Sequence, residues 1–152
     1  MNILLFKQIL LHSIGAFGGT LGYAFLLNAP INTVLPASLT GLLGYVIYEV
    51  MINLLGQGMI FSYFVATVII AVICEIAARK MRMPSTIFLL TALVPLVPGY
   101  TFYCVMLGIV EHNGAAVASY GLEAIQIVAV IAVGAAVTST LFRALTVRAR
   151  RR

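Results

Sequence analysis

Two ionisable side chains of this sequence fall inside long apolar segments. His12 lies within residues 4–27, and Glu49 lies within residues 35–55, one helical turn after Tyr45. A titratable group inside such a segment is costly, and it commonly belongs to an ion path or a proton relay. We therefore interpret Glu49 and His12 as proton-coupling candidates. Two plainer interpretations stay open: Glu49 remains hydrated near a membrane surface, and His12 only bonds to a neighbouring helix.

The second group of candidates surrounds the motif PLVPG at residues 95–99, in the middle of the apolar segment 85–110. Each proline lacks an N–H and clashes with the carbonyl one turn before it, so the pair interrupts a helix. The break frees carbonyls near residues 91–94 and N–H groups at the start of the next half-helix, which suit a carboxylate. Broken helices at membrane depth are typical of transporter sites, and a kink used only for packing is the alternative. The candidate substrate-binding residues are Pro95, Pro98, Gly99, Tyr100, Thr101 and Tyr103.

The composition indicates an integral membrane protein. Of the 152 residues, 62% are hydrophobic and 9% are charged, and the mean hydropathy is +1.12. A soluble domain carries about 25% charged residues. The net charge of +5 does not indicate nucleic-acid binding, because eight of the nine basic residues lie in the loop 79–82 or from Arg143 onward.

The apolar segments predict an all-α, polytopic membrane protein. A helix needs about 20 apolar residues to cross a bilayer. The short connections predict one bundle of about five antiparallel transmembrane helices in a single domain, 1–152, with a loop at 111–121 and the fourth helix broken at Pro95 and Pro98-Gly99. Because the second segment contains Glu49, four spans remain an alternative. The expected spans are 4–27, 35–55, 60–78, 85–110 and 122–145, followed by a basic cytoplasmic tail at 146–152.

The basic residues predict the orientation. Lys and Arg concentrate in cytoplasmic loops of membrane proteins. With five spans, the loop 79–82 and the arginine-rich tail lie on the same side, and only Lys7 lies near the other side. We therefore expect an amino end outside, a carboxyl end inside, and a location in the cytoplasmic (inner) membrane of a prokaryote.

Small residues mark expected contacts between helices. Glycine lets helices approach closely in lipid, where packing drives association. We expect close packing on one face of the first span and again on the second span. The residues on these two faces are His12, Gly15, Gly19 and Gly22, and Gly41 and Gly44.

Three further patterns have structural interpretations. Glu75 and Arg79 have the spacing of a helical ion pair. Cys74 and Cys104 lie in apolar surroundings and are expected to be buried hydrophobic residues. Thr138 and its neighbours in the last span are expected to bond back to their own helix.

The sequence contains no aspartate, no metal-ligand cluster, no nucleophile motif and no Walker sequence. We therefore expect a protein that is not an enzyme and that uses no cofactor. Transporters commonly join two related bundles. Since an odd number of spans does not divide into two equal halves, we expect the bundle to need a partner.

The segment Leu93-Val94-Pro95-Leu96-Val97-Pro98-Gly99-Tyr100 resembles the proline-glycine signature of the threonine/serine exporter family, in its smaller, carboxyl-terminal membrane half. The turn Asn28-Ala29-Pro30, the run Gly41-Leu42-Leu43-Gly44 and the order of spans are similar as well. The resemblance implies a small subunit of a split exporter that acts with a larger companion membrane subunit. It also implies export of threonine and serine, or of a dicarboxylate such as succinate.

These observations predict a secondary-active exporter of small carboxylate-bearing metabolites that works by alternating access around the break. The N–H groups of residues 99–101 would meet the substrate carboxylate, and Glu49 or His12 would carry the proton. Two alternatives remain. The chain is a structural subunit that only stabilises a partner, or it is a small homo-oligomeric exporter that uses Glu49.

Overall fold

The protein is all helical over residues 3–150, which the computed structural model describes, together with the side chains of residues 7 and 9–144. This confirms the predicted fold class. The elements are α1 (Ile3–Leu26), α2 (Ile31–Asn53), α3 (Met59–Met81), α4 (Ser85–Ala92), the 3-10 turn η1 (Val94–Leu96), α5 (Gly99–Val110) and α6 (Gly114–Arg150).

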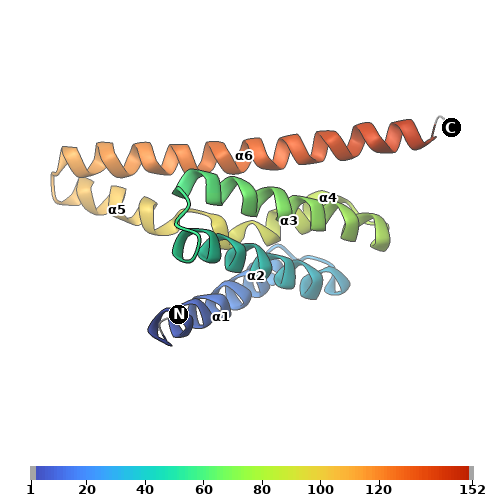
Figure 1. Cartoon of the computed structure of the whole chain (residues 1–152), viewed down its shortest axis with the longest axis horizontal. Helices are drawn as coiled ribbons and strands as arrows, with labels where there is room; N and C mark the ends of the chain where they lie inside the picture. The colour runs from blue at the N-terminus through green and yellow to red at the C-terminus, as the bar shows by residue number, and fades with distance from the viewer. Residues whose placement is uncertain (1–2, 151–152) are drawn as a thin grey trace.

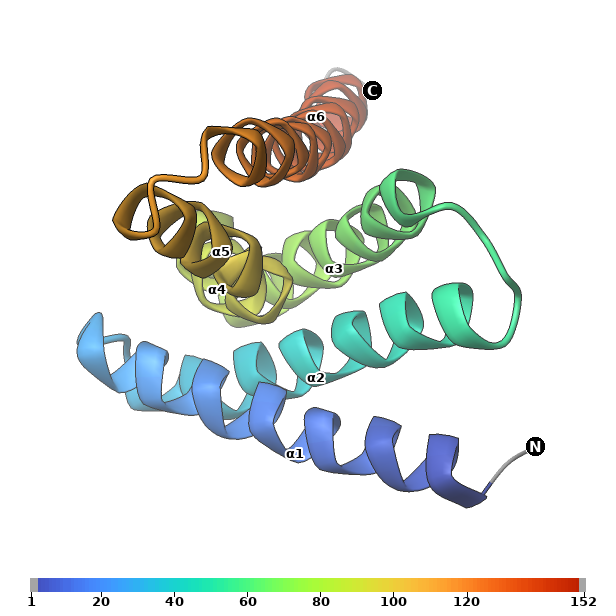
Figure 2. The ribbon, with the colours of Figure 1, turned by 90° about the vertical axis from the view of Figure 1, so that its left-hand side faces the viewer.

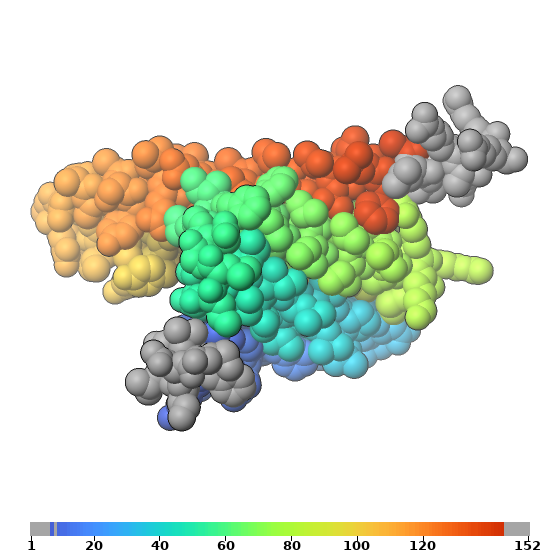
Figure 3. Space-filling view, viewed as in Figure 1, coloured from blue at the N-terminus to red at the C-terminus, as the bar shows by residue number. Residues whose placement is uncertain are grey.

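The helices stack in layers (Figures 1 and 2). Helices α1 and α2 form one layer, α3 and α4 lie over α2, and α6 covers α3 on the far side. Helix α5 packs on α6, and the two extend as a hairpin past the beginning of α3 (Figure 3). The turn η1 contacts both α1 and α2, so the helix break lies against the first layer.

Four described helices are long and apolar enough to cross a membrane: α1, α2, α3 and α6. The pair formed by residues 85–96 and 99–110 makes a fifth candidate if it crosses as one broken span. Its two halves are bent by 57°. The bend falls at the predicted proline motif, where the chain lacks two backbone donors.

The loop predicted at 111–121 is shorter than expected, because α6 already begins at Gly114. The side chain of Asn113 accepts a hydrogen bond from the N–H of Ala116 at 3.2 Å, as an N-cap residue does. Alanines then fill the first turns, and alanine is the best helix former. Helix α2 likewise begins earlier than residue 35 and contains Pro36.

Helices α1, α3 and α5 are each followed by a left-handed residue that turns the chain sharply. Asn28, Arg82 and His112 have φ values of 51°, 54° and 54°. After each of them, an N–H bonds to a carbonyl five residues earlier, as from Ala29 to Ala24 at 3.0 Å. This pairing satisfies carbonyls that the helix end would otherwise leave free. The turns bring α1 back against α2 and α5 against α6.

The buried core is built from small residues that let helices approach closely. A methyl group added to Gly41 would lie 2.8 Å from Thr20 Oγ1 and 3.1 Å from the carbonyl oxygen of Ala92. One added to Gly44 would lie 2.1 Å from Ile70 Cδ1. The predicted close packing on α2 is therefore confirmed.

The prediction of close packing on the glycine face of α1 is wrong for the described chain. No atom lies within 4 Å of a methyl group added at Gly15, Gly19 or Gly22. The buried residues of α1 include Ser13 and Thr20. These lie about half a turn away from the glycines, because successive residues advance by about 100°.

Three local predictions are confirmed. Arg79 Nη2 lies 3.8 Å from Glu75 Oε2, and Arg79 also donates to the carbonyl of Phe142. Cys74 and Cys104 are free and buried. Thr138 donates to a carbonyl one turn earlier in α6 at 2.9 Å.

Candidate functional site

The helix break is a tight, hydrogen-bonded turn. Pro98 has φ −75° and ψ 62°, and the N–H of Gly99 donates to the carbonyl of Val97 at 2.7 Å. These values define an inverse γ-turn centred on Pro98. The N–H of Leu96 bonds to Leu93 at 2.9 Å instead of to a carbonyl four residues earlier. The proline motif therefore replaces one helical turn with two shorter turns.

The break leaves fewer free N–H groups than the sequence predicts. Gly99 already has a partner within the turn, which differs from the expectation that its N–H meets a substrate. Within the described chain, the N–H groups of Tyr100 and Thr101 have no partner. The side chain of Thr101 is buried, whereas Tyr100 and Tyr103 are 75% and 60% exposed. The two tyrosines thus lie on an open face of α5.

The carbonyl of Ala92 lies just before the break and packs against Gly41. Its normal helical donor would be Leu96, whose N–H bonds to Leu93. The alpha carbon of Gly41 lies so close that a methyl group there would be 3.1 Å from this oxygen. Glycine in α2 therefore allows the broken segment to lie directly against the first layer.

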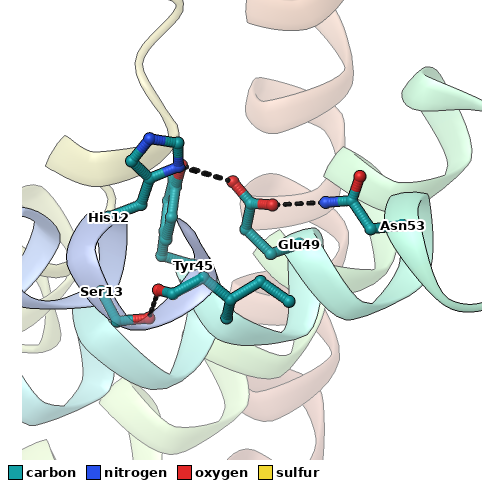
Figure 4. A network of polar contacts seen from close by, with 6 residues as sticks. His12, Ser13, Tyr45, Glu49 and Asn53 are labelled. Atoms are coloured by element: carbon teal, nitrogen blue, oxygen red, sulfur yellow. Dashed lines mark hydrogen bonds and ion pairs between the residues drawn. The ribbon is translucent and has the colours of Figure 1, made fainter. Parts of the chain in front are cut away.

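The carboxylate of Glu49 lies at the centre of a polar network between α1 and α2 (Figure 4). The hydroxyl of Tyr45 donates to Glu49 Oε1 at 2.7 Å, and His12 Nδ1 lies 3.4 Å from the same oxygen. The side-chain amide of Asn53 donates to Oε2. The glutamate side chain is 12% exposed and that of His12 is 52% exposed. The carboxylate of Glu49 is therefore mostly buried and accepts hydrogen bonds from Tyr45 and Asn53.

An open cavity of about 330 Å³ joins this network to the helix break. Its lining includes His12 and Gly15 of α1, Tyr45 of α2 and Pro95 of η1. Sites for small ligands typically have volumes of about 300–1,000 Å³. The structure thus brings two of the predicted groups of residues to one cavity. Tyr100 and Tyr103 are not among the residues that line it.

His12 lines the cavity, whereas Glu49, whose Oε1 lies 3.4 Å from His12 Nδ1, is not among the lining residues. A histidine nitrogen beside a carboxylate is held as a donor, which fixes its tautomer. The other ring nitrogen of His12 has no partner in the described chain and remains available to a ligand. The described residues contain no group of three or more His, Cys, Asp or Glu side chains that could hold a metal ion.

Sequence reasoning missed two members of this region. Asn53 follows Glu49 by one helical turn, and this spacing was a usable signal. Tyr63 of α3 packs its ring 4.4 Å from that of Tyr48. No local sequence pattern predicts the contact between Tyr48 and Tyr63, because it depends on how α2 and α3 pack together.

A family model described as threonine/serine exporter, ThrE, matches residues 12–141. The matched range covers most of the chain and includes His12, Glu49 and the complete break. The chain belongs to the threonine/serine exporter family. The resemblance seen in the sequence is therefore confirmed.

As a member of the threonine/serine exporter family, the chain is a multi-pass membrane protein of amino-acid export. A transporter needs a place where substrate meets the coupling group inside the membrane. The cavity lined by His12, Tyr45 and Pro95 lies between α1, α2 and the helix break. No curated protein and no solved structure matches the chain.

Proposed function

We propose that this chain is one subunit of a secondary-active exporter of small carboxylate-bearing metabolites. The single observation that carries the proposal is the cavity in which His12, Tyr45 and the break residue Pro95 meet. It lies at the kind of broken helix that transporters use to bind substrates. Within the family, the candidate substrates are threonine and serine, or a dicarboxylate such as succinate.

The ionisable pair formed by His12, which lines the cavity, and Glu49, which lies 3.4 Å from it, favours an amino acid. His12 in its protonated form suits a carboxylate, and ionised Glu49 suits an ammonium group. Together they complement the zwitterion of threonine or serine. A dicarboxylate lacks the positive group, so it would face Glu49 unpaired.

The same pair provides a coupling mechanism. When Glu49 binds a proton, its attraction for the substrate ammonium group is lost, and the substrate is released. Proton and amino acid therefore compete for one carboxylate, as exchange of an inward proton for an outward substrate requires. Tyr45 and Asn53 orient the carboxylate, while Pro98-Gly99, Tyr100, Thr101 and Tyr103 form the hinge region and the open face beside it.

A larger companion membrane subunit of the same family completes the transporter in this proposal. Tyr100 and Tyr103 are mostly exposed, and a binding site normally buries about 70–90% of a small ligand. The companion would cover this side of the broken helix. We also propose that the protein lies in the inner membrane with its amino end outside and its carboxyl end inside, as the basic residues favour.

Export by cells that lack their own threonine exporters tests the proposal. We expect labelled threonine or serine to leave cells that contain the chain and its companion, and Glu49→Gln to abolish this export. Glu111→Gln is the matched control, since Glu111 lies exposed at the end of α5. Full export with Glu49→Gln would refute the coupling role, and export by the chain alone would favour a homo-oligomer.

A further inference from the structure

An apolar groove of about 580 Å³ runs along the seam between α1 and α2. It is lined by residues of α1 between Ile9 and Phe17 and by residues of α2 between Leu39 and Val46. Because the two helices lie side by side and antiparallel (Figure 2), Ile9 and Val46 mark one end of the groove, and Phe17 and Leu39 mark the other. The lining residues of α1 do not include His12, so the groove is separate from the cavity at the helix break.

The lining of the groove suits hydrocarbon. Ser13 is its one polar residue, and the Ser13 hydroxyl donates to the carbonyl of Ile9 at 2.6 Å, within its own helix. The other lining residues are leucine, isoleucine, valine and phenylalanine, and none is glycine or alanine. Helix-to-helix contacts in lipid are instead enriched in small and polar residues. The chemistry of the groove therefore favours an acyl chain over a helix of another protein.

The length of the groove matches one leaflet of a bilayer. Residues 9–17 of a helix extend for about 12 Å, and half of the hydrocarbon core is about 15 Å thick. Helix α1 continues beyond the groove to Leu26. A transmembrane helix bound here would need a contact along both leaflets, whereas the groove ends near Phe17. A single acyl chain needs no longer site than this.

A positive charge lies at the Ile9 end of the groove. Lys7 is exposed and is the one basic residue in the sequence of α1. It precedes Leu10 by three residues and Ile14 by seven, so it lies on the helix face that lines the groove. Lysine near the end of a membrane helix extends its ammonium group to the interface. The charge and the groove thus follow each other in the order of the phosphate and the acyl chain of a phospholipid.

We propose that this groove binds one acyl chain of a membrane phospholipid and that Lys7 pairs with the phosphate of the same lipid. The proposal does not depend on the exporter function, because it uses neither the cavity at His12 nor the helix break. It predicts a lipid that occupies a defined site on the protein, unlike the lipids that exchange freely over the rest of its surface.

The absence of tryptophan from the sequence allows a direct test. Phe17→Trp places a fluorescent reporter in the groove, and Phe61→Trp is the matched control, because Phe61 is exposed on α3 outside the groove. The full chain in detergent is titrated with phosphatidylglycerol that carries bromine on its acyl chains and quenches tryptophan on contact. We expect quenching of Phe17→Trp to saturate at one lipid per chain, and quenching of Phe61→Trp to rise steadily with the lipid content of the micelle. Leu39→Trp is a second reporter at the same end of the groove if Phe17→Trp does not fold.

Two kinds of substitution in the Phe17→Trp protein separate the phosphate contact from the acyl-chain contact. Lys7→Gln should weaken lipid binding by about fivefold, the scale of one basic residue at an anionic membrane surface. Leu10→Phe and Leu43→Phe should remove the saturable quenching, because their larger rings fill the groove; both positions are half-exposed and tolerate a larger side chain.

Three results would overturn the proposal. Quenching of Phe17→Trp that rises without saturation, as in Phe61→Trp, would show that the groove holds only bulk lipid. Loss of the quenching when a companion subunit or a second copy of the chain binds would assign the groove to a protein helix. Unchanged lipid binding in Lys7→Gln would refute the pairing of Lys7 with the phosphate.

Discussion

Replacing Gly44 by alanine tests the contact that holds α2 against α3. The new methyl group would lie 2.1 Å from Cδ1 and 2.3 Å from Cγ1 of Ile70, far inside the ordinary carbon–carbon distance of about 3.5–4.0 Å. Ile70 is fully buried, so its side chain has little room to move. Helices α2 and α3 must then separate, and Tyr48, one turn beyond Gly44, would move away from Tyr63.

The size of the effect follows from the same distances. Forcing an extra methyl group into a packed core costs about 1–3 kcal/mol. Ile70→Ala removes both clashing carbons and costs about 2–5 kcal/mol as a single change, because it leaves a cavity. In the double variant the new methyl group lies 3.9 Å from the beta carbon of residue 70, an ordinary contact. We therefore expect the double variant to be more stable than the sum of the single changes by about 0.5–3 kcal/mol.

Unfolding of the purified protein in detergent, followed by circular dichroism, measures these free energies. Gly15→Ala is the control, since no atom lies within 4 Å of a methyl group at Gly15, and it should not destabilise the protein. Strict additivity of Gly44→Ala and Ile70→Ala would refute the packing of α2 on α3 described above. So would a Gly44→Ala variant that is as stable as the Gly15→Ala variant.

Three other substitutions have defined outcomes. Tyr45→Phe removes a donor from the carboxylate of Glu49 and should lower the free energy of unfolding by about 1.5–3 kcal/mol; a stability equal to that of the wild type would contradict the bond. Glu75→Gln should change the free energy of unfolding by less than about 1 kcal/mol, because Arg79 is partly exposed and also contacts Phe142; a larger loss in the same assay would contradict this reasoning. Asn113→Ala should cost about 1 kcal/mol by removing the N-cap of α6, with Asn113→Asp as the conservative control that keeps the cap.

The sequence predicted the helical class and the break because both depend on local chemistry. Long apolar segments require helices in a bilayer, and Pro95 and Pro98 interrupt a helix wherever they occur. The start of α6 was missed because Asn113 and the alanines after it look equally like a loop of small residues. The packing of the glycine face of α1 was mispredicted because a small-residue pattern indicates that a helix can pack closely but does not identify the neighbouring helix.

The candidate site depended more on tertiary structure. The sequence indicated Glu49, His12 and Pro95 separately, each from the cost of its residue type inside a membrane. His12 and Pro95 share a cavity because α1 folds back on α2 and η1 lies against both, and Glu49 adjoins it through His12. The contact between Tyr48 and Tyr63 likewise depends on the close approach at Gly44, and no sequence spacing connects two helices in this way.

The most direct test is export of labelled threonine, serine and succinate from cells that express the chain with and without its larger companion subunit. We expect export of threonine or serine only when both proteins are present, and loss of this export with Glu49→Gln. If both proteins are in the membrane and none of the three substrates leaves the cells, the proposed exporter function is contradicted. Export of succinate alone would contradict the fit of the His12–Glu49 pair to an amino acid.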